Sequence, residues 1–250
     1  MKTAIVGIGN LGWNLAHGFQ SVGVPIDYLI TRNQEKASVL SKEFPESNCL
    51  DGSFVPVDVE LLFLCLPDDQ LATFANQIGN HECAIVHCSG NTLDLNLSNQ
   101  KTGVFYPFQT FTIGRSINWP ETPIFIESKD KILRAYLHEL ASRLSDRVNE
   151  INSDQRQALH IAGVFGANFN NHLIQLISEI LIEAELPFEL AKPLIQETVS
   201  KAFDLTPIKA QTGPAIRGDK NVVADHLKRL EKHPKLVDFY KLFTQSIQNH

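Results

Sequence analysis

The sequence predicts an α/β fold with a mostly parallel, doubly wound sheet, followed by an all-α part. Short apolar runs alternate with segments of helical spacing as far as about residue 145, a pattern typical of βαβ units. After about residue 150 the helical spacing continues and strand-like runs cease. We therefore expect two domains, residues 1–150 and residues 151–250.

The elements of the first domain follow from short apolar runs and from apolar residues three or four positions apart. Residues 60–66 form an apolar run that is typical of a buried strand, whereas Leu11, Leu15 and Phe19 recur at helical spacing. The predicted strands are residues 3–8, 25–30, 60–66, 83–88, 103–106 and 123–127. The predicted helices are residues 10–22, 33–44, 67–78 and 129–145.

The second domain is predicted to contain helices alone. Asn152 and Ser153 offer an N-cap for the first, and Pro187 ends it. The predicted helices are residues 154–184, 188–203, 219–231, which Asp219 could cap, and 234–248. The first of them is apolar on most of its circumference, so we expect it to be largely buried.

Composition excludes several classes of protein. Hydrophobic residues make up 43% of the chain and charged residues 20%, close to globular averages. A net charge of −6 disfavours a nucleic-acid partner. No apolar run approaches the ~20 residues of a membrane span, and Gly7 interrupts the only apolar run near the N-terminus. We expect a cytoplasmic protein with neither a membrane nor a nucleic-acid partner.

The four cysteines favour a reducing compartment. Cys65 and Cys88 fall within predicted strands and no CxxC pair occurs, which argues against a disulfide framework. The segments at residues 81–83 and 87–88 combine histidine, glutamate and cysteine. Alternation along a strand sends neighbouring side chains to opposite faces, so we expect no metal site there.

A glycine-rich turn follows the first predicted strand and opens the first helix. It consists of Gly7, Ile8, Gly9, Asn10, Leu11 and Gly12, a GxGxxG pattern. In a Rossmann fold the first glycine permits a tight turn, the second admits a pyrophosphate, and the third lets helix and strand pack closely. The helix N-terminus adds free N–H groups and a positive dipole end. The alternative is a glycine-rich turn that binds nothing.

Residues after the second strand indicate which dinucleotide is bound. NAD usually requires an acidic residue there, but this chain has Thr31, Arg32 and Asn33. Arg32 can pair with a 2′-phosphate, and its neighbours can form hydrogen bonds to it, so NADP is favoured. The alternative is that Arg32 is a solvated surface residue and the loop backbone binds the 2′-OH.

The carboxyl ends of the later strands should face the nicotinamide. Leu66, Pro67 and Ser89 occupy such positions, and so does the pair Tyr106–Pro107. Simple turn chemistry is the alternative for each of them.

A polar stripe runs along the helix predicted from residue 154. His160, Asn168 and Asn171 lie within about a quarter of its circumference. Histidine titrates near neutral pH, so His160 could serve as a general acid. Hydrogen-bonded core residues are the alternative. In the loop at residues 212–219, Arg217 could bind an anionic substrate group or could instead pair with Asp219.

With these motifs the chain resembles a family of Rossmann-like proteins, labelled NADP oxidoreductases, that carry a C-terminal helical domain of unknown function. The motifs are GIGNLG at 7–12, LPDD at 66–69, HCSGN at 87–91, YPFQTF at 106–111, the stripe at 160–171 and GPAIRGD at 213–219. It is more distantly similar to pyrroline-5-carboxylate reductases, ketopantoate reductases and 3-hydroxyacid dehydrogenases. The dehydrogenases place a lysine and an asparagine near the substrate; that lysine is absent here, and His160 and Asn168 are the nearest candidates. The resemblance implies a homodimer formed through the helical domain.

Two functions remain open from the sequence. The first is an NADP-dependent oxidoreductase that transfers hydride to or from a small carbonyl, imine or hydroxy-acid substrate in an interdomain cleft. His160 would donate the proton, Asn168 and Asn171 would orient the substrate, and Arg217 would bind an anionic group. The second is a non-catalytic NADP(H)-binding sensor or regulatory protein.

Overall fold

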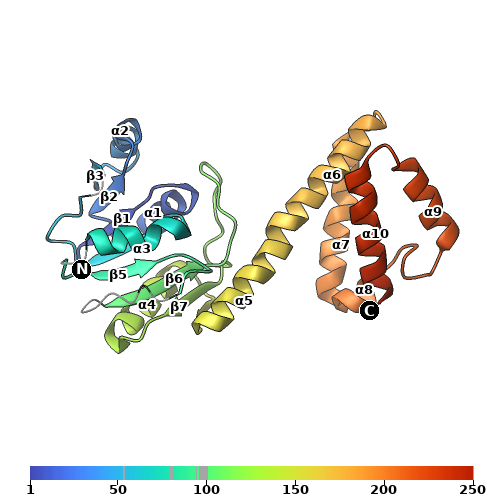
Figure 1. The fold of residues 1–250 in the computed structure, drawn as a ribbon. Helices are drawn as coiled ribbons and strands as arrows, with labels where there is room; N and C mark the ends of the chain where they lie inside the picture. Colours follow the sequence, from blue (N-terminus) through green and yellow to red (C-terminus); the bar gives the residue numbers. More distant parts are fainter. Residues whose placement is uncertain (53, 79–80, 94, 96–100, 250) are drawn as a thin grey trace. The chain divides into compact units, whose positions relative to one another are not determined.

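The computed structural model describes residues 1–52, 54–78, 81–93, 95 and 101–249. The chain divides into two compact units, Met1–Asn171 and His172–His250 (Figure 1). The first unit extends beyond the boundary expected near residue 150. It includes α5 (Ser153–Gly163) because side chains at the start of this helix bond to the sheet.

One mostly parallel sheet organises the first unit, as the sequence predicted. Its strands are β1 (Thr3–Val6), β2 (Tyr28–Thr31), β3 (Asn48–Asp51), β4 (Leu61–Leu64), β5 (Ala84–His87), β6 (Thr102–Pro107), β7 (Ile124–Glu127) and β8 (Val148–Glu150). Their order is β3-β2-β1-β4-β5-β6-β7-β8, and only β6 and β7 pair antiparallel among the described ladders. The sequence did not predict β3 and β8, because these edge strands are short and largely polar.

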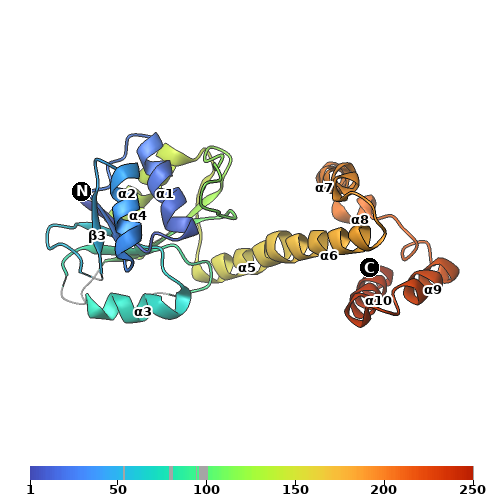
Figure 2. The same cartoon turned by 90° about the horizontal axis from the view of Figure 1, so that it is seen from above.

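Helices cover both faces of this sheet. The helices are α1 (Asn10–Ser21), α2 (Gln34–Glu43), α3 (Asp68–Gln77) and α4 (Lys131–Leu144). Alternation along β1 sends Ile5 into a core cluster with residues of α1, α2 and α4, and sends Ala4 into a second cluster with residues of α3. Figure 2 shows α3 on the face opposite α1, α2 and α4. Because both faces are covered, a ligand can approach the sheet only at its strand ends.

The long helix predicted from residue 154 is interrupted. A π-helical segment, Val164–Phe169, separates α5 from α6 (Asn170–Glu183). The expectation that this helix is largely buried is wrong for the single chain. The side chains of Ile161, Phe165 and Phe169 are 60%, 66% and 50% exposed, and α6 has no buried residue. Apolar periodicity predicts which face of a helix is suited to burial, but it does not show what covers that face. In the single chain, no described segment buries these side chains.

The described part of the second unit contains helices joined by turns and loops, and no strand. After α6 it contains a 3₁₀ turn (Phe188–Ala191), α7 (Lys192–Leu205), α8 (Pro207–Ala210), α9 (Lys220–Arg229) and α10 (Pro234–Gln248). The short helix α8 was not predicted; Thr206, with a φ of 80°, separates it from α7. Asp219 stands at the N-cap of α9 but forms no side-chain capping bond. The buried hydrophobic side chains described in this unit are those of Ala191, Ala210 and Ala215.

Candidate functional site

The turn between β1 and α1 has the backbone geometry that its glycines predicted. Gly7 has a φ of +88°, and a Cβ on Gly7 would lie 2.6 Å from the carbonyl oxygen of Cys65. A Cβ on Gly12 would lie 2.2 Å from the oxygen of Gly7, whereas no heavy atom beyond Gly9 and its two chain neighbours lies within 4 Å of the Cβ position on Gly9. Gly9 is the N-cap of α1 and supplies no side-chain cap. The turn therefore presents open backbone and the first N–H groups of α1, which suit an anion.

Polar residues at the end of β2 divide into two roles. Thr31 is 7% exposed, and Arg32 is exposed. Asn33 caps α2: its Oδ1 atom accepts a hydrogen bond of 2.8 Å from the backbone N–H of Lys36. The side-chain oxygen of Asn33 is therefore committed to the helix. Its amide NH₂ and the guanidinium of Arg32 are the donors that this strand end offers to a ligand.

A large cavity of about 780 Å³ lies at the carboxyl ends of β4, β5 and β6. Of the residues expected at the site, it brings together Gly9, Leu11, Leu66, Pro67, Ser89, His160 and Asn168. Asn171 does not belong to its described lining, and Arg217 lies in the second unit. One cavity thus joins the open glycine of the phosphate turn to the histidine of the polar stripe.

His160 is paired with a tyrosine at this cavity. The Oη atom of Tyr106 lies 3.2 Å from Nδ1 of His160. Gly90 makes this approach possible, because a Cβ there would lie 2.6 Å from that nitrogen. Burial raises the pKa of Tyr106 above its usual value of 10.0, so the phenol keeps its proton and can donate a hydrogen bond to Nδ1. In the tautomer that accepts this hydrogen bond at Nδ1, the ring proton lies on Nε2.

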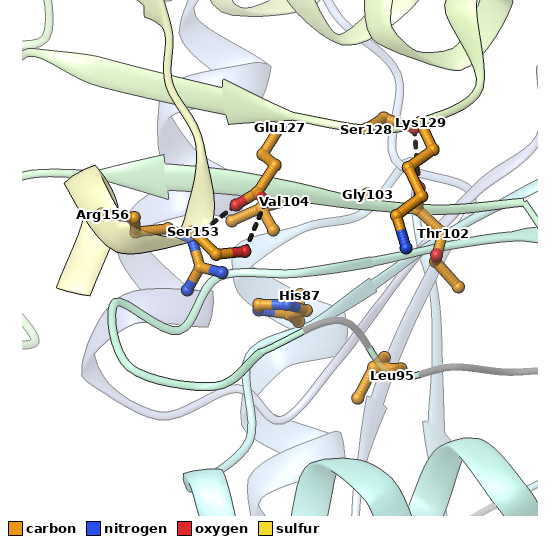
Figure 3. Close-up of a pocket in the computed structure, with 10 residues that line it drawn as sticks. All are labelled: His87, Leu95, Thr102, Gly103, Val104, Glu127, Ser128, Lys129, Ser153 and Arg156. Carbon is orange, nitrogen blue, oxygen red and sulfur yellow. Dashed lines mark hydrogen bonds and ion pairs between the residues drawn. The ribbon is translucent and has the colours of Figure 1, made fainter.

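A buried ion pair holds the helix that carries His160. Arg156 is 1% exposed; its Nε lies 3.0 Å from Oε2 of Glu127, and its Nη1 donates to the carbonyl oxygen of Ser89 at 2.9 Å. Figure 3 shows this ion pair and the hydrogen bond from Ser153 to the same carboxylate, beside a small cavity of about 110 Å³. Arg156 therefore ties α5 both to β7 and to the loop that follows β5, one helical turn before His160.

The profile of one family matches the chain at residues 122–247; its description is Domain of unknown function (DUF2520). The match covers slightly more than half of the chain. The chain belongs to the DUF2520 family.

Solved structures extend the likeness of this DUF2520 protein to the whole chain. A Bacteroides fragilis protein, provisionally named an NADP oxidoreductase, is 35% identical, with a TM-score of 0.93, over 100% of this chain and 98% of that one. An imine reductase from Myxococcus stipitatus in complex with NADP⁺ is 14% identical, with a TM-score of 0.69, over 100% and 95% of the two chains. Plasmodium falciparum pyrroline carboxylate reductase with NADP bound is 15% identical, with a TM-score of 0.59, over 100% and 98%. The last two show the fold alone.

The comparisons confirm the family resemblance that the sequence motifs predicted, including the distant likeness to pyrroline carboxylate reductases. No match was found among curated proteins.

Sequence reasoning missed several residues of the DUF2520 site. It assigned no role to Arg156 or Glu127, although an arginine one turn before His160 on a mostly apolar helix was a usable signal. It placed Tyr106 only near a strand end. It treated Cys65 and Cys88 as strand core, whereas both line the large cavity. Pairing between residues distant in sequence becomes visible only in the fold.

In the part of the chain that the structure describes, no three histidine, cysteine, aspartate or glutamate side chains converge on a common point for a metal ion. None of the helices described there has the length and apolarity that crossing a membrane requires.

Proposed function

We propose that this DUF2520 protein is an NADP(H)-dependent oxidoreductase that transfers hydride between the nicotinamide and a small carbonyl, imine or hydroxy-acid substrate. The observation that carries the proposal is that Gly9, open for phosphate, and the paired His160 line one cavity. The name of the Bacteroides fragilis relative, and the NADP bound to the reductases from Plasmodium and Myxococcus, agree with it.

The residues of the chain fit the proposed cofactor. The pyrophosphate would rest on the backbone of Gly9 and on the first N–H groups of α1, since no side chain occupies either place. Arg32, exposed after β2, would pair with the 2′-phosphate, with Thr31 and the amide NH₂ of Asn33 beside it. Leu66, Pro67 and Ser89 would border the nicotinamide end, because they follow β4 and β5.

NADPH supplies the hydride when it is bound, and the protein supplies position and a proton. Nε2–H of His160 would donate that proton to the substrate oxygen or nitrogen, while Tyr106 holds the ring through Nδ1. Asn168 lines the same cavity and would orient the substrate. Asn171 and Arg217 stay candidates for orienting the substrate and for binding an anionic group, respectively.

A homodimer formed through the helical unit completes the proposal. The side chains of Leu194, Phe203 and Ile208 are 71%, 88% and 80% exposed, and few hydrophobic residues described in this unit are buried. Exposed apolar area of this kind marks an interaction surface. A second copy presents the same faces, and a cyclic pair is the commonest closed assembly. We place this dimer in the cytoplasm, since the chain carries unpaired cysteines.

Calorimetric titration with NADPH and NADH, followed by turnover assays, tests the function. We expect heat with NADPH, and consumption of reduced nicotinamide with at least one member of a panel of imines, keto acids and aldehydes. A sensor without catalysis is the second candidate, because the described lining of the large cavity contains no lysine. It predicts tight NADPH binding without turnover on the whole panel. Absence of heat with both dinucleotides would refute both functions.

A further inference from the structure

Two cysteines lie side by side in the lining of the large cavity. Cys65 follows β4 and Cys88 follows β5, and these parallel strands place Leu64 opposite His87, so the cysteines occupy the next pair of positions. Their Sγ atoms are 3.8 Å apart, and both residues line the cavity. Neighbouring strands lie ~4.8 Å apart. That spacing falls within the Cα separations of about 4.4–6.8 Å that disulfides span.

The two thiols differ in access. Cys65 is half-buried, whereas Cys88 is 5% exposed. The hydrogen bond with Cys65, together with burial, raises the pKa of Cys88 well above its usual value of 9.0. An oxidant entering the cavity therefore meets Cys65 first, and Cys88 is placed to react second.

We propose that Cys65 and Cys88 are a site of reversible oxidation to a disulfide, and that this oxidation and NADP(H) binding exclude one another. The second half rests on the proposed function. With oxidised glutathione as the oxidant, the thiolate of Cys65 attacks one of its sulfurs and releases one glutathione thiolate. Cys88 then loses its proton, attacks Sγ of Cys65 and displaces the second glutathione. Two electrons and two protons pass to the oxidant, which leaves as two reduced glutathione molecules.

The phosphate turn rests on the same cysteine. A Cβ on Gly12 would lie 3.2 Å from Cβ of Cys65, and a Cβ on Gly7 would lie 2.6 Å from its carbonyl oxygen. A disulfide draws the two sulfurs from 3.8 Å to bonding distance, and we expect Cys65 to shift beneath that turn as the bond forms. The shift alters the surface on which the dinucleotide would lie. Reciprocally, a bound dinucleotide covers Cys65 and slows its oxidation.

The test uses the full chain with Cys49 and Cys83 replaced by serine, which leaves Cys65 and Cys88 as its cysteines. A matched control adds Cys88→Ser. Each variant is incubated with oxidised glutathione and alkylated, and its mass is measured by intact-protein mass spectrometry. NADPH affinity is measured by calorimetry before oxidation, after oxidation, and after treatment with a reductant. The wild-type chain, read by peptide mapping, gives the same information should the Cys83 replacement unfold the protein.

We expect the variant that retains Cys65 and Cys88 to lose both alkylatable thiols without retaining glutathione. The control with Cys88→Ser should keep one glutathione on Cys65. NADPH affinity should fall by about tenfold on oxidation and return with the reductant, and saturating NADPH should slow disulfide formation by a similar factor. Thiols that stay alkylatable overturn the disulfide, and a disulfide that leaves NADPH affinity unchanged overturns the exclusion. If the fully reduced protein gives no heat with NADPH, the proposed function and the exclusion both fail, while the mass measurement still decides the disulfide.

Discussion

Tyr106 Oη and His160 Nδ1 lie 3.2 Å apart, although the two residues are 54 positions apart in the sequence. The tyrosine ends a sheet strand and the histidine lies on α5, so the contact joins the two elements at the edge of the cavity. The raised pKa of Tyr106 keeps the phenol protonated, so its O–H is available as a hydrogen-bond donor to Nδ1 of His160.

Removing either member of this pair should reduce turnover and spare cofactor binding. We expect His160→Gln to lower kcat by about 100-fold or more, since a proton donor is lost. Tyr106→Phe should lower kcat by roughly tenfold, since the imidazole ring loses a positioning hydrogen bond of about 1 kcal/mol. Tyr136→Phe, at a half-buried tyrosine that packs on the core, is the control. A parallel loss of NADPH affinity in the two site variants would instead mean that the pair supports the fold.

Arg32→Ala should separate the two dinucleotides. A charge-assisted hydrogen bond to the 2′-phosphate contributes about 2 kcal/mol, so NADPH affinity should fall roughly 30-fold while NADH affinity changes little. Calorimetry with both cofactors measures the difference. Arg147→Ala serves as the control, because Arg147 is exposed and directly precedes β8, at the opposite edge of the sheet. Equal losses of affinity for NADPH and NADH would contradict the assignment of Arg32 to the 2′-phosphate.

Removing one partner of the buried Arg156–Glu127 ion pair should lower the free energy of unfolding more than replacing both partners. Glu127→Gln leaves the charge of Arg156 buried without its partner, and we expect the free energy of unfolding to fall by about 3 kcal/mol. The double variant Glu127→Gln with Arg156→Met removes that charge as well, so it should be more stable than the single variant. Denaturant unfolding of the three proteins measures both effects. A double variant that is less stable than Glu127→Gln would contradict this interpretation.

The free energy of unfolding should fall at alkaline pH because the buried thiol of Cys83 resists ionisation in the folded state. Burial raises the pKa of this thiol from its usual 9.0 to about 11. A group whose pKa is raised by folding stabilises the folded state below its unfolded pKa, and that contribution is lost as the pH rises through the folded value. The free energy of unfolding should therefore fall by roughly 2 kcal/mol between pH 9 and pH 11. Cys83→Ala should flatten this part of the curve, and an unchanged slope would show that other groups cause the decline.

The proposed dimer can be tested by substituting two hydrophobic residues of similar exposure, one in each unit. Phe203, in the helical unit, is 88% exposed, and Val57, in the first unit, is 87% exposed. Phe203→Asp should convert the dimer to a monomer in native mass or light-scattering measurements, because it buries a charge in the proposed interface. Val57→Asp should leave the dimer intact. A wild-type chain that is monomeric at micromolar concentration would rule the dimer out.

Local patterns were sufficient for much of the fold and for part of the site. The apolar run at residues 60–66 and the glycines at 7, 9 and 12 each carry their information within a few neighbouring residues, so β4 and the phosphate turn were predictable. The edge strand β3 was not predicted, since its exposed polar ends, Asn48 and Asp51, leave no continuous apolar run. From the sequence, Asn33 could bind the 2′-phosphate or cap α2. Only the structure shows that its side-chain oxygen accepts the capping hydrogen bond from the N–H of Lys36.

The sequence by itself determined the order of most strands and helices, the place of the phosphate turn and the candidacy of His160, because backbone preference and burial act over a few residues. Only the tertiary structure decided which distant side chains meet: Tyr106 with His160, Arg156 with Glu127, and Cys65 with Cys88. These pairs arise from sheet register and helix docking, in which the whole core takes part, and no short segment of the chain encodes either.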